Sequence, residues 1–112
     1  MNFARTDQGE NTTLRIEGSL DAISTPELRL VIDTLVADKR KQITVDLSAL
    51  RLIDSSGVGV LVSLFKRIRA SGGEVRLEGL RDQPLAIFKL LRLDRVFPGS
   101  PGAPRAPGQP DS

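Results

Sequence analysis

The chain has 112 residues, a length that suits one small domain with a single modest core. It contains no His, Cys, Tyr or Trp, which excludes disulfides, thiolate metal sites and histidine-assisted nucleophiles. The formal net charge is only +2 and no dense basic stripe supports nucleic-acid binding. The longest apolar stretches are too short to span a bilayer, and no targeting signal is present. We therefore expect a cytoplasmic protein that is not an enzyme and needs no cofactor or metal.

The N-terminal part of the chain predicts two strands. Residues 3–7 favour a short edge strand, and residues 8–11 a turn. Residues 12–17 alternate between apolar and polar side chains, which is typical of a strand with one buried side. Residues 18–21 predict a loop that ends this strand, with Leu20 continuing its buried face.

A helix start signal follows in the segment Ser24-Thr25-Pro26-Glu27. Either Thr25 caps the helix with Pro26 at the first helical position, or Ser24 and Glu27 form a capping box. The helix runs to about Ala37. Its apolar residues recur at core spacing; they are Leu28, Val31, Ile32 and Leu35.

The central part of the chain predicts a strand and the longest helix. Residues 42–47 alternate again, with apolar side chains at every second position. Residues 48–54 connect this strand to a helix over about residues 56–71. The apolar face of the helix contains Val58, Leu61, Val62, Phe65 and Ile68.

A third alternating strand is expected over residues 74–78, followed by a short helix over residues 83–92. We assign Leu85, Ile87, Phe88, Leu90 and Leu91 to the apolar side of that helix. Residues 93–97 favour a last short strand. From residue 98 the composition changes to Pro and Gly without apolar periodicity. This predicts a folded domain over residues 1–97 and a disordered tail over residues 98–112.

The order of strands and helices predicts an α/β fold with right-handed parallel crossovers. Buried central strands of a doubly covered parallel sheet usually form continuous apolar runs, whereas all three clear strands here alternate. We therefore expect a mixed, largely parallel sheet of four to five strands with helices on one face only.

The stretch Ile53-Asp54-Ser55-Ser56-Gly57-Val58-Gly59 joins a strand to the central helix. Asp54, Ser55 and Ser56 are all good helix caps, and the free N–H groups of a helix N-terminus can also hold an anion. Ser56, with Asp54 as its rival, is our choice for the cap. A phosphoryl group on a serine here would be tolerated by the helix N-terminus and would change the local field sharply. The glycines would allow close approach of another backbone or a ligand.

Two catalytic interpretations of this stretch fail on its residues. A nucleophilic serine at a strand–helix turn normally has Gly-x-Ser-x-Gly spacing and a histidine base, and both are absent. The Gly-rich loop that cradles nucleotide phosphates is also missing. The serines therefore indicate either plain capping or a modification that controls binding.

These residues resemble the signature of the STAS domain family, in particular of bacterial anti-sigma factor antagonists. The resemblance lies in Asp46-Leu47-Ser48-Ala49-Leu50, in the Asp54-Ser55-Ser56-Gly57 stretch, and in Gly18-Ser19-Leu20-Asp21, where the family commonly has Gly-Glu-Leu-Asp. It covers about residues 3–97. The family's mixed sheet with helices on one face agrees with the strand alternation.

The resemblance implies a partner-switching function. The unphosphorylated antagonist binds an anti-sigma factor that is also a serine kinase of the GHKL type, and so releases the sigma factor. The kinase phosphorylates one serine, which ends the binding, and a PP2C-type phosphatase restores it. By motif position the phosphoacceptor is Ser55, flanked by Asp21 and Asp54. Ser56 and Gly57 complete its surroundings.

The resemblance also leaves points open. Ser19 replaces the usual Glu, which removes one acid from the expected interface. Nothing in it implies nucleic-acid contact or membrane insertion, and a weak homodimer stays an open alternative. A second hypothesis is a STAS interaction module without phosphorylation, in a transporter or stressosome-like assembly. In that case the helix face near Gly57, Val60 and Leu64 would dock the partner.

Overall fold

An antiparallel hairpin begins the sheet. It consists of β1 (Asn2–Gln8) and β2 (Asn11–Leu20), which pair along their whole length from Asn2 opposite Glu17 to Gln8 opposite Asn11. The computed structural model describes residues 2–93 of the chain. The turn passes through Gly9 at φ 58°, a left-handed conformation that glycine adopts without steric cost.

The remaining strands are parallel to β2 or to each other. β3 (Gln42–Asp46) pairs with the first half of β2, and β5 (Glu74–Glu78) pairs with β3. β4 (Leu50–Ile53) pairs with the end of β2, where the register shifts between Gly18 and Ser19. The described sheet thus has five strands, and the predicted mixed, largely parallel fold is confirmed.

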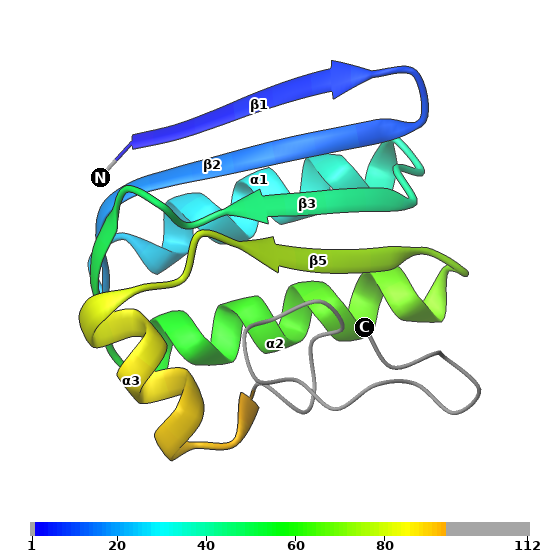
Figure 1. The fold of residues 1–112 in the computed structure, drawn as a ribbon. Helices are drawn as coiled ribbons and strands as arrows, with labels where there is room; N and C mark the ends of the chain where they lie inside the picture. Colours follow the sequence, from blue (N-terminus) through cyan, green and yellow to red (C-terminus); the bar gives the residue numbers. More distant parts are fainter. Residues whose placement is uncertain (1, 94–112) are drawn as a thin grey trace.

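Helices α1 (Thr25–Ala37) and α2 (Ser55–Ala70) lie side by side along one face of the sheet, as Figure 1 shows. α3 (Asp82–Leu90) lies at the end of the sheet and packs against β4. The core between helices and sheet is formed by alternate strand residues and by one stripe of each helix. None of the helices within residues 2–93 has the length and apolarity that crossing a membrane requires.

The other face of the sheet is polar. The residues that alternate with the core positions are exposed or half-buried on β2, β3 and β5. On neighbouring strands Thr13, Thr44 and Arg76 lie opposite one another, as do Arg15, Asp46 and Glu78. The prediction that helices cover one face only therefore holds for the part of the chain that is described.

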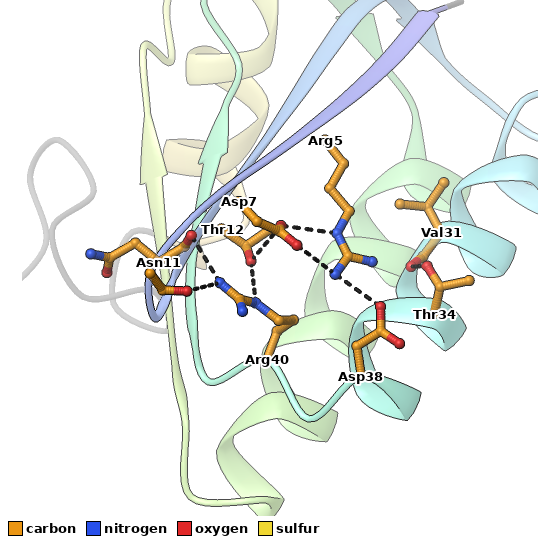
Figure 2. A network of polar contacts seen from close by, with 9 residues as sticks. Arg5, Asp7, Asn11, Thr12, Val31, Thr34, Asp38 and Arg40 are labelled. Atoms are coloured by element: carbon orange, nitrogen blue, oxygen red, sulfur yellow. Dashed lines mark hydrogen bonds and ion pairs between the residues drawn. The ribbon is translucent and has the colours of Figure 1, made fainter.

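A polar network holds the hairpin turn to the end of α1, at the end of the sheet where β2 and β3 begin (Figure 2). Arg40 donates to the Thr12 hydroxyl oxygen at 2.6 Å and to the carbonyl oxygens of Gly9 and Asn11 at 2.8 and 3.0 Å. Arg5 bridges Asp7 and Asp38, with N–O distances of 3.1 and 2.9 Å. Charged side chains thus fix the β1–β2 turn to the α1–β3 connection.

Three element predictions are wrong. Residues 48–54 were expected as a plain connection but contain β4, and β2 continues to Leu20 where a loop was expected. Both errors have one cause, because each short segment is a strand only through pairing with the other. α3 ends at Leu90, and Leu90 and Leu91 are 76% and 51% exposed although they were assigned to its apolar side.

The last predicted strand starts at Leu93, which does not lie in a strand. Its other residues, 94–97, and the predicted tail, 98–112, lie outside the described part of the chain.

Candidate functional site

The predicted site lies where β2 and β4 end side by side. Leu20 and Ile53 are register partners, and the Asp54 N–H donates to the Leu20 carbonyl oxygen at 3.1 Å. Asp21 and Asp54 therefore leave neighbouring parallel strands at the same edge of the sheet. The structure thus brings together the two motifs that the sequence analysis linked only by resemblance.

Asp54 caps helix α2. Its backbone is extended, with φ −112° and ψ −176°, and its carboxylate accepts a hydrogen bond from the Gly57 N–H at 3.1 Å. Its carbonyl oxygen accepts from the Val58 N–H at 3.0 Å. The prediction that Ser56 caps the helix is wrong. The helix begins at Ser55, one residue earlier than expected, so Ser56 already lies in the first turn with helical backbone.

Ser55 occupies the first helical position, and its side chain is exposed, whereas Ser56 is half-buried. Within residues 2–93 neither hydroxyl forms a hydrogen bond. The Ser55 hydroxyl is thus accessible at a helix N-terminus, where the first backbone N–H groups have no partner inside the helix. This arrangement can accept a phosphoryl group without disturbing an existing contact.

Gly57 allows α2 to come unusually close to the two strand ends. A Cβ atom at this position would lie 2.7 Å from the Leu20 carbonyl oxygen and 2.8 Å from Ile53 Cγ1. A Cβ at Gly59 would have no neighbour within 4 Å. The close approach expected of both glycines therefore applies to Gly57 alone, where it serves packing of the helix on the sheet.

Asp21 shapes the loop that enters α1. Its carboxylate accepts hydrogen bonds from the backbone N–H groups of Ile23 and Ser24 at 3.0 and 3.1 Å. The Ser24 hydroxyl in turn accepts from the Asp21 N–H at 3.0 Å and donates to the Ser19 carbonyl oxygen at 3.0 Å. One oxygen of the half-buried Asp21 carboxylate is thus committed to the loop.

The same contacts overturn both capping predictions for α1. Ser24 is the N-cap residue, but its side chain forms no cap hydrogen bond, because its hydroxyl points back to the end of β2. Thr25 is the first helical residue and donates to the Ala22 carbonyl oxygen at 3.5 Å. Pro26 therefore takes the second helical position.

A groove of about 810 Å³ opens beside the site and extends over the ends of β2 and β4. Asp21 and the 90% exposed Ile23 line it, together with the cations of Arg51 and Arg81. Asp54 and Ser55 are not among its lining residues. In the described part of the chain no three His, Cys, Asp or Glu side chains are grouped to hold a metal ion.

The second hypothesis predicted that a partner docks on the α2 face near Gly57, Val60 and Leu64, and this prediction is wrong. Gly57 is buried, and Val60 and Leu64 are both 0% exposed, because this stripe of α2 faces the sheet. A partner could reach these side chains only by separating the helix from the core.

Sequence reasoning missed Gln83. Its side-chain amide accepts a hydrogen bond from the Ile53 N–H at 2.9 Å and donates to the Ile53 carbonyl oxygen at 3.0 Å. The two residues are 30 positions apart, and Ile53 was not predicted to lie in a strand, so no local pattern could have paired them. The only feature of the sequence that could have pointed to Gln83 was its polar side chain at the start of the last predicted helix.

Comparison with known proteins agrees with this geometry. A family model described as the STAS domain matches residues 2–105. The anti-sigma-B factor antagonist of Bacillus subtilis strain 168 is 32% identical over 90 residues, which cover 80% of this chain and 82% of that protein.

Two solved structures show the same fold. An anti-sigma factor antagonist from Mycobacterium paratuberculosis gives a TM-score of 0.76 at 23% identity, covering 87% of this chain and 82% of that one. The Bacillus cell fate determinant SpoIIAA in its phosphorylated form gives 0.68 at 23% identity, covering 96% and 93%.

Proposed function

Because this chain belongs to the STAS domain family, we propose that it acts as an anti-sigma factor antagonist in a partner-switching pathway. In its unphosphorylated form it binds an anti-sigma factor, which then releases its sigma factor. Phosphorylation of Ser55 ends this binding. The protein works in the cytoplasm as a binding regulator, without catalysis of its own.

One observation carries the assignment of Ser55. It combines an exposed side chain, the first position of α2 and a hydroxyl that forms no hydrogen bond within residues 2–93, directly after the capping carboxylate of Asp54. A phosphoryl group there adds about −1.5 to −2 charges, which the helix N-terminus tolerates and which Asp54 repels. SpoIIAA, which has this fold, exists in a phosphorylated form. The modification can therefore change the surface charge while α2 and the core stay in place.

The partners follow from the same proposal. The anti-sigma factor is a serine kinase of the GHKL type that uses ATP, and a PP2C-type phosphatase reverses the modification. The acids Asp21 and Asp54 follow the neighbouring ends of β2 and β4, next to the serine, and in this proposal the kinase recognises them on the unmodified surface. Ser56 and Gly57 shape the helix start behind it.

The test compares three variants with the purified cognate kinase and ATP. We expect one added phosphoryl group in the parent and in Ser56→Ala, located on Ser55 by mass spectrometry, and none in Ser55→Ala. Ser55→Asp should fold normally but bind the kinase at least about tenfold more weakly, the equivalent of 1.4 kcal/mol. Phosphorylation of Ser55→Ala at the parental rate would refute the assignment, and unchanged affinity of Ser55→Asp would refute the switch.

A further inference from the structure

The outer edge of β4 has no neighbouring strand within residues 2–93, and a side chain takes the place of one. β4 pairs with β2 on one side. On the other side the Gln83 amide accepts from the Ile53 N–H and donates to the Ile53 carbonyl oxygen, at 2.9 and 3.0 Å. An adjacent strand would satisfy the same two backbone groups in the same way.

These two bonds hold the residue directly before the helix cap. Ile53 is 3% exposed with Gln83 in place, so a side chain of similar size without polar atoms would leave both of its backbone groups without a partner. The next residue, Asp54, is bonded through its N–H to the Leu20 carbonyl oxygen. The segment that enters α2 is therefore held from both sides, by β2 and by Gln83.

Gln83 lies in the first turn of α3. Asp82 has φ 54°, a left-handed conformation that residues with a Cβ rarely adopt. The N-cap residue Arg81 forms no side-chain cap hydrogen bond. The chain thus turns at Asp82, directly before Gln83, and Asp is among the residues with a Cβ that adopt this conformation most readily.

We propose that Gln83 is a positioning residue for the phosphoacceptor Ser55, acting through the backbone of Ile53 and Asp54. The proposal rests on the function proposed above for Ser55. Gln83 forms none of its hydrogen bonds with Ser55; it fixes the end of β4 and so the place where the hydroxyl stands at the helix N-terminus. Phosphoryl transfer depends mainly on positioning, so a displaced hydroxyl slows it even when the kinase still binds.

Two substitutions separate the hydrogen bonds of Gln83 from its bulk. Gln83→Met keeps the approximate size but makes neither bond. Gln83→Glu keeps an acceptor for the Ile53 N–H but loses the donor and places a carboxylate oxygen against the Ile53 carbonyl. Arg40→Ala is the matched control, because it removes a polar clamp at the opposite end of the sheet.

The main measurement is the single-turnover rate of Ser55 phosphorylation with ATP and saturating cognate kinase, corrected for the folded fraction. We expect this rate to fall on the order of tenfold in both Gln83 variants and to stay at the parental value in Arg40→Ala. A role in stability alone would lower the folded fraction but leave the corrected rate unchanged. Equal corrected rates in all four proteins would therefore overturn the proposal.

Amide hydrogen exchange distinguishes failure of this proposal from failure of the function on which it rests. We expect the Asp54 N–H to exchange at least tenfold faster in Gln83→Met than in Arg40→Ala at matched stability. A parent that its kinase does not phosphorylate would overturn the proposed function and the role of Gln83 in it. Normal phosphorylation with unchanged Asp54 exchange in Gln83→Met would overturn the positioning role alone.

Discussion

Gly57 sets the distance between α2 and the strand ends that carry the site. Any Cβ there would lie 2.7–2.8 Å from Leu20 and Ile53 atoms, closer than such atoms normally approach. We expect Gly57→Ala to be destabilising, because overpacking costs about 1–3 kcal/mol while the helical preference of Ala returns at most about 1 kcal/mol. Urea unfolding measures the difference in the free energy of unfolding.

Gly59→Ala is the control for this prediction. A Cβ at Gly59 has no neighbour within 4 Å, so only the gain in helix propensity remains. This variant should be more stable than the parent by up to about 1 kcal/mol. The explanation by close approach fails if Gly57→Ala is as stable as Gly59→Ala.

The position of the candidate site at the start of α2 could be predicted from sequence, but the residue that caps the helix could not. Asp54, Ser55 and Ser56 are all chemically able to cap a helix, so the motif alone could not rank them. The N-cap is the residue with extended backbone directly before the helix. Asp54 takes this place because Ile53, the residue before it, pairs with Leu20 as the end of β4. Local chemistry placed the helix start to within one residue, and tertiary contacts assigned the cap to Asp54.

At the scale of elements, Arg40 joins the β1–β2 turn to the end of α1. Its three hydrogen bonds include one to the hydroxyl of Thr12, which is 1% exposed. We expect Arg40→Ala to lower the free energy of unfolding by about 1–3 kcal/mol, because charged donors are lost and a buried hydroxyl loses a partner. Chemical denaturation measures the loss, and hydrogen exchange should locate it in the hairpin.

Arg67→Ala is the control for this prediction, because it removes the same single positive charge as Arg40→Ala. Arg67 pairs with Asp33 at 2.7 Å, but both side chains are about half exposed, at 42% and 57%. Exposed ion pairs typically contribute less than about 1 kcal/mol. A larger loss in Arg67→Ala than in Arg40→Ala would show that the carbonyl and hydroxyl contacts of Arg40 are not what holds the hairpin.

The elements with a long periodic signal were predictable, and those that exist only through pairing were not. The start of α1 and the alternation of β2, β3 and β5 follow from side-chain pattern and helix start signals. β4 has only four residues, and its burial does not alternate regularly. Its outer edge is completed by a glutamine 30 residues away, which no local window contains.

For the molecule as a whole, two aspartates link stability to pH. Hydrogen bonds from the Arg5 guanidinium lower the pKa of Asp7, and those from the Ser48 hydroxyl and N–H lower the pKa of Asp46. A carboxylate whose pKa is lowered by folding stabilises the folded protein. This contribution is fully present above the ordinary pKa of 3.8 and is lost as the pH falls through the lower pKa of the folded protein. We therefore expect acid to destabilise the protein progressively below about pH 4.

Asp46→Asn tests one half of this linkage. The amide oxygen can still accept from Ser48, but the side chain no longer titrates. The free energy of unfolding, measured in urea between pH 7 and pH 2.5, should fall less steeply below pH 4 in this variant than in the parent. Identical slopes would mean that the contacts of Asp46 do not contribute to the acid sensitivity.

The contact between Gln83 and Ile53 can form only after the ribosome has added Gln83 to the chain. A ribosome adds about 5–20 residues per second, so the 30 residues between these partners delay Gln83 by about 2–6 s after Ile53. During that interval the nascent chain already contains Ser55 but lacks the amide that completes the edge of β4. On the role proposed for Gln83, phosphorylation of Ser55 would begin only after the edge of β4 is complete.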